Sequence, residues 1–122
     1  MKTAYVVFAH GSRVEAANEA VREVARQFAR RGGYEIVEVA FLDCEPPDLV
    51  MKIGELAARG VRRAVVLPYF LTLGRHAAED LPRIAAEASR IHKGMRVEIA
   101  PAMEGHPALI DILLERAREA AR

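Results

Sequence analysis

Four short apolar segments alternate with four amphipathic segments along this chain, and this alternation limits its possible folds more than any other feature. The apolar segments are residues 4–9, 36–42, 64–71 and 97–100, and the amphipathic ones are about 13–31, 46–60, 81–93 and 107–121. Apolar runs this short, bounded by turn residues, are typical of strands buried on both faces. Their strict alternation with helices predicts a parallel sheet covered by helices on both sides.

The predicted fold class is therefore α/β, a flavodoxin-like three-layer sandwich. Its four-stranded parallel sheet is expected in the order 2-1-3-4, with helices on both faces. Ligands of such sheets bind beyond the carboxyl ends of the strands, at the point where the strand order reverses. In this order that point lies between the first and third strands, so the loops after these two strands are the first places to search for a site.

The composition of the chain limits the kinds of partner that we expect it to bind. The 122 residues carry a formal net charge of +1, with 29% charged residues and 6% aromatic residues. This balance predicts a single domain, residues 1–122, with no general attraction to nucleic acid and few aromatic side chains for stacking bases. No apolar run approaches the ~20 residues of a membrane span, and no signal-peptide pattern opens the chain, so we expect no membrane partner and a cytoplasmic protein.

Two histidines fall in the two loops that the topology selects. The loop after the first strand reads Ala9-His10-Gly11-Ser12-Arg13, and the loop after the third ends in Gly74-Arg75-His76. Ser12 to Glu15 matches a capping box, which predicts a helix starting directly after the first loop. His10 would then project from a strand tip, where packing gives no reason for an imidazole. The pairing with His76 across the reversal point indicates a ligand or base role for both.

A carboxylate follows the second strand at the same edge of the sheet. Asp43 comes directly after Leu42, and Glu45 is a competing candidate or a charge that complements a helix start. Two imidazoles and a carboxylate suit a loosely held first-row divalent metal. The single cysteine, Cys44, excludes an intrachain disulfide, and we expect it to be a small buried hydrophobic residue.

Three further polar residues have competing interpretations. Asp80 could orient the imidazole of His76, or cap the third helix just before Leu81-Pro82. His92 is expected to serve the end of that helix, where a cation is favourable. His106 is expected mainly in a turn that enters the last helix. On that helix, Ile110, Leu113 and Leu114 form either a surface patch or part of the core.

At this point the motifs resemble a known family. The two histidine loops, Phe41-Leu42-Asp43, the segment Leu67 to His76, and Asp80-Leu81-Pro82 resemble the sirohydrochlorin chelatases. These are the CbiX-like, ATP-independent class II chelatases of cobalamin and sirohaem synthesis, which have a chelatase-like fold of this type. The resemblance runs from residue 5 to about residue 115. Either histidine motif alone would be weak, but the two at this separation are specific.

The resemblance implies an enzyme, a metal chelatase (lyase), that inserts a divalent metal into sirohydrochlorin. Cobalt is the first expectation, with nickel or iron as alternatives, and the metal is a substrate, so no permanent cofactor is expected. His10 and His76 would handle the metal and act in catalysis with Asp43, although the family often carries Glu at this last position. The chain resembles the short members of the family, which work as homodimers. In these members, two copies of the domain take the place of the two lobes of longer members.

The implied substrate explains the basic residues of the loops. Sirohydrochlorin carries many carboxylates, so Arg13 and Arg75 would bind them, with Ser12 and Gly74 also at the substrate. A non-enzymatic carrier or sensor of divalent metal using the same histidine pair is the main alternative. A third reading is a phosphate-binding domain that uses Gly11, Ser12 and the helix start. Neither alternative accounts for the match across both loops.

Overall fold

The computed structural model describes residues 2–122, except for the side chain of His76. Strands and helices alternate along this range: β1 (Thr3–Ala9), α1 (Glu15–Gly32), β2 (Val37–Phe41), α2 (Leu49–Ala58), β3 (Arg63–Pro68), α3 (Arg75–Ile91), β4 (Arg96–Ile99) and α4 (Pro107–Ala120). The strands form one sheet in the order β2-β1-β3-β4, and every pairing is parallel. The predicted fold class and strand order are confirmed.

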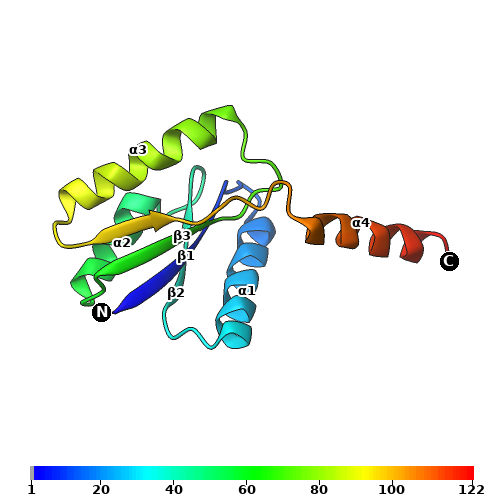
Figure 1. Ribbon diagram of the computed structural model, residues 1–122, viewed down its shortest axis with the longest axis horizontal. Helices are drawn as coiled ribbons and strands as arrows, with labels where there is room; N and C mark the ends of the chain where they lie inside the picture. Colours follow the sequence, from blue (N-terminus) through cyan, green and yellow to red (C-terminus); the bar gives the residue numbers. More distant parts are fainter. Residues whose placement is uncertain (1) are drawn as a thin grey trace.

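The sheet is the middle of three layers. α1 lies on one face, and α2 and α3 lie on the other (Figure 1). The central strand β1 is buried over four consecutive residues, Val6 to Ala9, because both of its faces are covered. In β3 burial alternates, and Ala64 and Val66 belong to the main core. That core is completed by apolar side chains of the two helices on this face: Leu49, Ile53, Leu56, Leu81 and Ala88.

The third helix starts earlier than the sequence predicts. α3 begins at Arg75, after Gly74 with φ +74°, and not near Leu81. Asp80 is therefore not its N-cap. It lies within the helix, and its carboxylate accepts a hydrogen bond from Arg83 at 2.9 Å. An Asp just before Leu-Pro is a typical helix start, but Arg, Ala and Glu before it favour helix, and Pro82 occupies an exposed position.

The last helix differs from the other three in its surroundings. α4 extends away from the sheet and the other helices (Figure 1). None of its residues is buried, and Ile110, Ile112, Leu113 and Leu114 are all exposed. Of the two interpretations left open for its apolar residues, the surface patch is correct. Within the described residues, no helix has the length and apolar character needed to cross a membrane.

Candidate functional site

The carboxyl ends of the strands meet at one edge of the sheet, and backbone hydrogen bonds continue there beyond the strands themselves. Leu42 N donates to Ala9 O at 2.9 Å, and Tyr69 N donates to Phe8 O at 2.7 Å. The loops after β1, β2 and β3 therefore begin side by side. The topology thus brings the predicted site loops to a common edge, with β1 between β2 and β3.

Gly11 fixes how the first two loops meet. Its φ is +90°, and a Cβ at this position would lie 1.9 Å from Asp43 O. Only glycine allows this close backbone approach. Next to it, Asp43 N donates to His10 O at 2.9 Å. The backbones of His10 and Asp43, two of the predicted catalytic residues, are thus directly hydrogen-bonded.

A buried asparagine, which the sequence analysis did not single out, holds the same loop. Asn18 in α1 is 2% exposed, and its side chain bonds both backbone groups of Ser12. Ser12 N donates to Asn18 Oδ1 at 2.9 Å, and Asn18 Nδ2 donates to Ser12 O at 2.8 Å. A polar residue at an inward-facing helical position was the available signal. This paired contact fixes the chain two residues after His10.

The predicted capping box is wrong. The N-cap of α1 is Val14, and it makes no side-chain capping bond. Ser12 Oγ instead accepts a hydrogen bond from Val14 N at 3.0 Å, so it stabilises a turn before the helix. Glu15 bonds Arg22 and does not reach back to Ser12. The N-cap lies two residues later than the capping box requires, and Ser12 is held instead by Asn18.

His10 is exposed at the end of β1, as expected for a residue that meets a ligand. Its Nδ1 lies 3.2 Å from Gly11 O. A carbonyl oxygen only accepts hydrogen bonds, so this contact places the proton of the neutral ring on Nδ1. Nε2 then carries the free lone pair, which is the form of histidine that binds a metal ion. Arg13, three residues further, is also exposed.

The two carboxylates of the loop after β2 have different partners. Asp43 is exposed, and one of its oxygens, Oδ1, accepts a hydrogen bond from Cys44 N at 2.8 Å. Glu45 forms an ion pair with Arg22 of α1 and so ties this loop to the helix. Cys44 is exposed with φ +67°, so the expectation that it is buried is wrong. Of the two acids, Glu45 is engaged in an ion pair, whereas the contact found for the Asp43 carboxylate is with the next backbone N–H.

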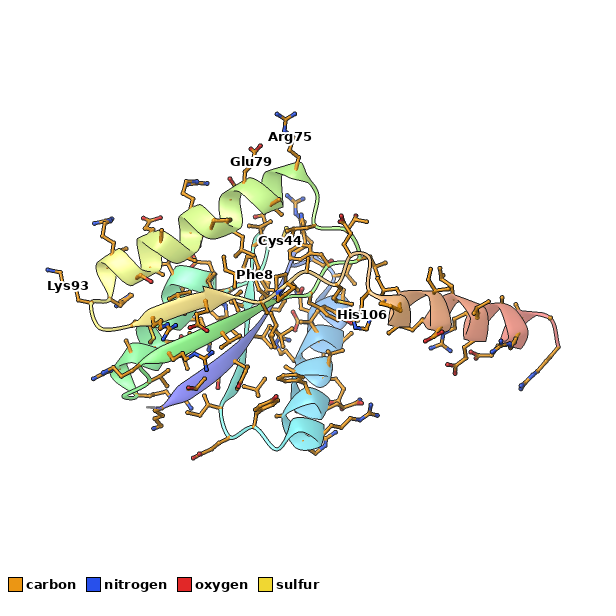
Figure 2. The ribbon with its side chains drawn as sticks, viewed as in Figure 1. Phe8, Cys44, Arg75, Glu79, Lys93 and His106 are labelled. Carbon is orange, nitrogen blue, oxygen red and sulfur yellow. The ribbon has the colours of Figure 1, made fainter. Side chains whose placement is uncertain are left out.

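The loop after β3 carries the second predicted cluster. Gly74 is the N-cap of α3, and His76 lies in the first turn of that helix, but the His76 side chain lies outside the described residues. Arg75 is exposed, pairs with Glu79 at 3.3 Å, and points away from the sheet (Figure 2). A second contact missed by sequence links the loops after β3 and β4, because Leu73 N donates to Glu104 Oε1 at 3.1 Å.

The remaining histidines have structural roles. His106 is the N-cap of α4, and its Nδ1 accepts a hydrogen bond from Ala108 N at 3.0 Å. His92 ends α3, and its ring packs against α2, where a Cβ on Gly54 would lie 3.1 Å from the imidazole. Both histidines thus lie at helix ends, as predicted. Among the residues that the structure describes, no three His, Cys, Asp or Glu side chains gather as a metal site.

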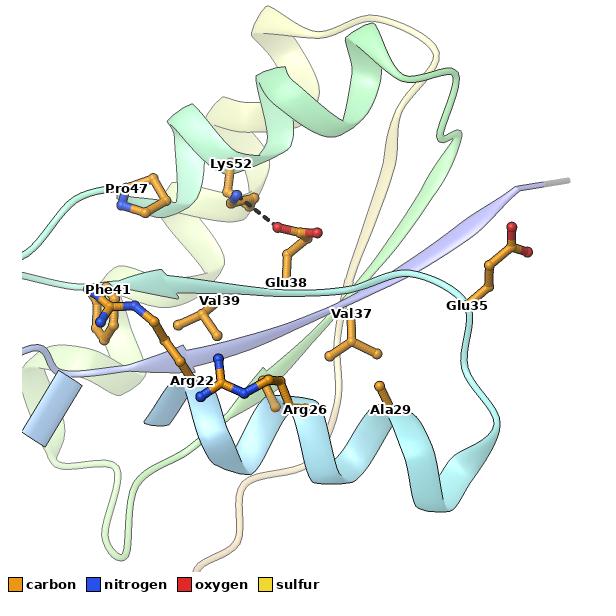
Figure 3. A pocket seen from close by; sticks show the side chains of 11 residues that line it. Arg22, Arg26, Ala29, Glu35, Val37, Glu38, Val39, Phe41, Pro47 and Lys52 are labelled. Atoms are coloured by element: carbon orange, nitrogen blue, oxygen red, sulfur yellow. Dashed lines mark hydrogen bonds and ion pairs between the residues drawn. The ribbon is translucent and has the colours of Figure 1, made fainter. Parts of the chain in front are cut away.

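A separate cluster of charged side chains lies along β2. A cavity of about 330 Å³ follows the outer edge of β2 (Figure 3). In it, Lys52 Nζ donates to Glu38 at 3.0 Å and to Glu55 at 2.7 Å. Burial acts to lower the pKa of Lys52, but these two carboxylates outweigh it and the pKa is raised. The ion pairs hold α2 against β2, which explains the charges without a ligand.

Comparisons with known proteins agree with this geometry. The sirohydrochlorin ferrochelatase of Arabidopsis thaliana is 31% identical over 111 residues, which are 91% of this chain and 49% of that protein. The sirohydrochlorin cobaltochelatase of Methanococcus aeolicus is 25% identical over 139 aligned positions, covering 94% of this chain and 97% of that protein. The chain thus spans about half the length of the first relative and nearly all of the second.

The fold has solved counterparts as well. The sirohydrochlorin chelatase SirB of Bacillus subtilis subspecies spizizenii, solved in complex with cobalt, superposes with a TM-score of 0.88 at 21% identity. The match covers 98% of this chain and 51% of that chain, and so includes α4. The model of the CbiX family matches residues 4–120. A match over nearly the whole chain, with the fold and strand order described above, shows that this chain belongs to the CbiX family.

Proposed function

We propose that this protein is a sirohydrochlorin chelatase, which inserts a divalent metal ion into sirohydrochlorin without ATP. One observation carries the proposal. In a chain of the CbiX family, an exposed imidazole stands at the end of β1, with its Nδ1 bonded to a carbonyl and its backbone bonded to Asp43. This arrangement supplies an imidazole and a carboxylate from two adjacent loops, at the edge where ligands of such sheets bind.

The reaction has simple requirements. A divalent ion must lose water, and two pyrrole N–H protons must leave the ring as the metal enters it. We assign transient binding of the ion to Nε2 of His10, with His76 as the second imidazole. Asp43 accepts one proton, since the bond from Cys44 N uses only one of its carboxylate oxygens, and the other proton passes to water. Weak, temporary ligation suits this task because the metal has to move on to the ring.

The substrate is recognised in this proposal by charge and by shape. Arg13 and Arg75 are exposed near the two histidine positions and bind carboxylates of the tetrapyrrole. Ser12 and Gly74 contribute the turns that let the substrate approach the backbone. Tyr69 and Leu71, which are exposed after β3, provide an apolar surface on which the ring lies.

Cobalt is the proposed metal, with nickel and iron as alternatives. The naming of the Methanococcus aeolicus relative as a cobaltochelatase supports cobalt, whereas the Arabidopsis relative is named a ferrochelatase. All three ions accept imidazole and carboxylate ligands. The metal is a substrate, and no permanent cofactor is part of the proposal. The activity would belong to cobalamin or sirohaem synthesis in the cytoplasm.

The functional unit in this proposal is a homodimer of single-domain chains. The chain corresponds to about half of the Arabidopsis and Bacillus proteins, and to nearly all of the Methanococcus protein. Two copies would supply what the longer proteins have in one chain.

The proposal is tested by following the absorbance spectrum of sirohydrochlorin with Co²⁺, Ni²⁺ or Fe²⁺. We expect the protein to accelerate metallation over a protein-free control, with Co²⁺ fastest. His76→Ala should lose most of the acceleration while keeping its circular dichroism spectrum. A protein that binds Co²⁺ tightly in a titration but leaves the metallation rate unchanged would be a carrier, and the chelatase proposal would fail.

A further inference from the structure

The loop after β2 carries Asp43 at the start of a tight and strained turn. Glu45 N donates a hydrogen bond to Asp43 O at 2.8 Å, across Cys44, whose φ is +67°. A hydrogen bond that closes three residues around a left-handed central residue defines a γ-turn of the rare, strained form. Such strain persists only where the surrounding contacts hold the chain in place. The contacts on either side of Cys44 therefore determine where Asp43 lies.

Two elements hold this turn, one on each side. On one side, Asp43 N donates to His10 O in the loop after β1 at 2.9 Å. On the other side, Arg22 of α1 donates through Nη2 to a carboxylate oxygen of Glu45. Within the described part of the chain, no other hydrogen bond ties residues 44–46 to another element. The second half of the turn therefore depends on Arg22.

The same guanidinium also contacts the end of β2. Its Cζ lies 5.8 Å from the centre of the Phe41 ring, a distance at which a cation and an aromatic face attract each other (Figure 3). Phe41 is 1% exposed, so its ring is a fixed surface for this contact. Phe41 comes two residues before Asp43, and Glu45 comes two residues after it. Arg22 therefore contacts the chain on both sides of Asp43.

Arg22 is in turn held by its own helix. Its Nη1 donates to Glu15 at 2.6 Å and to Glu19 at 3.2 Å, and both acids belong to α1. The hydrogen bond to Glu15, together with those to Glu19 and Glu45, raises the pKa of Arg22 above its usual value. The Arg22 side chain is 29% exposed, compared with 88% for Arg75. Since both of its terminal nitrogens are bonded within the protein, Arg22 differs from an arginine that is free to bind a substrate.

We propose that Arg22 is a positioning residue for metallation, which holds Asp43 in place through Glu45 and Phe41. The proposal rests on the proposed function, in which Asp43 accepts a proton. A proton acceptor must lie within hydrogen-bond reach of the proton, and a displacement of about 1 Å can lower a rate by about 100-fold. Lysine would supply the same charge, but it lacks the planar group that bonds several carboxylates and faces a ring at the same time.

Amide hydrogen exchange tests the anchoring without an assay of activity. The exchange rate of the Glu45 N–H, which is bonded to Asp43 O, is measured by NMR in the unsubstituted protein and in Arg22→Ala. We expect exchange to be about tenfold faster in Arg22→Ala. Arg26→Ala is the matched control, because Arg26 lies one turn further along α1 and pairs with two glutamates of the same helix. This control should leave the exchange rate within about twofold of the unsubstituted protein.

Steady-state metallation then separates positioning from substrate binding. Arg22→Ala should lower kcat about tenfold and leave the KM for sirohydrochlorin within about twofold, whereas Arg26→Ala should change neither. Glu45→Gln keeps an oxygen that accepts from Arg22, so it should retain most of the rate that Glu45→Ala loses. Asp43→Asn keeps the oxygen that accepts from Cys44 N but removes the proton acceptor. In that background, Arg22→Ala should lower kcat by less than about twofold.

The possible results separate this proposal from the proposed function. An unchanged exchange rate or an unchanged kcat in Arg22→Ala would overturn the positioning role. A raised KM with an unchanged kcat would make Arg22 a substrate-binding residue, which also overturns it. An equal loss of kcat with and without Asp43→Asn would show that Arg22 acts through another group. Each of these results leaves the chelatase standing, because the unsubstituted protein still accelerates metallation. No acceleration by the unsubstituted protein would refute the proposed function and this proposal together.

Discussion

Replacing Gly11 by alanine should disrupt the close backbone contact between the loops after β1 and β2. The new Cβ would lie 1.9 Å from Asp43 O, whereas real Cβ contacts do not fall below 3.0 Å. The loops must therefore separate by about 1 Å. This movement would break the 2.9 Å bond from Asp43 N to His10 O, at a cost of about 1 kcal/mol. The left-handed backbone, with φ +90°, adds about 1–2 kcal/mol.

Gly33→Ala provides a matched control. Gly33 also has a positive φ, +68°, but a Cβ there would meet nothing within 4 Å. It carries the backbone cost alone, about 1 kcal/mol after the gain from a less flexible unfolded chain. We expect Gly11→Ala to lower the free energy of unfolding by about 2–4 kcal/mol in urea titrations, and to slow metallation strongly. Equal stability and equal activity of the two variants would refute the argument that this close approach positions His10 and Asp43.

Three further predictions concern the supports of the site. Asn18→Ala should lower the free energy of unfolding by about 2–3 kcal/mol, because two buried hydrogen bonds are lost, while Ser12→Ala should cost under about 1 kcal/mol; equal losses in urea titrations would contradict this. Hydrogen bonds from arginines of α1 lower the pKa values of Glu15 and Glu19 below 4.5. These ionised carboxylates therefore stabilise the fold above pH 4.5, and this stabilisation is lost as the pH falls further. The melting temperature should fall more steeply below pH 4.5 in the unsubstituted protein than in a variant with glutamine at both positions. The same dependence of melting temperature on pH in both proteins would contradict this prediction. Arg75→Ala should raise the KM for sirohydrochlorin several-fold and leave stability within about 0.5 kcal/mol, because this side chain is 88% exposed; an unchanged KM would remove Arg75 from substrate binding.

The fold follows from the sequence because its determinants are local and regular. Short apolar runs alternating with amphipathic segments leave few arrangements once crossovers are right-handed, so the strand order and the carboxyl-edge loops are predictable. The same reasoning places His10 and Asp43 at one edge. Their hydrogen-bonded backbones depend on Gly11, whose tight approach to the next loop cannot be seen in the sequence of either loop alone.

The wrong predictions concern helix starts, where contacts that are distant in sequence or the surrounding helix override a local sequence motif. Ser12 and Glu15 have the spacing of a capping box, but the buried Asn18 binds both backbone groups of Ser12, and the helix begins later. Asp80 followed by Leu-Pro has the pattern of a helix start, yet α3 is already formed from Arg75. Whether α4 packs on its own sheet cannot be predicted from the sequence for a similar reason. Its apolar stripe is the same whether it is covered by its own sheet or by another surface.

The central claim is that the imidazole at the end of β1 carries the metallation chemistry, and two histidine variants test it directly. His10→Ala removes this imidazole, whereas His92→Ala removes one that packs between α3 and α2, away from the site. The initial rate of cobalt insertion into sirohydrochlorin is measured by absorbance for both, with circular dichroism to verify folding. We expect the rate of His10→Ala to fall at least a hundredfold toward the protein-free rate, while that of His92→Ala stays within a fewfold of the unsubstituted protein. A folded His10→Ala variant that retains the full rate would contradict it.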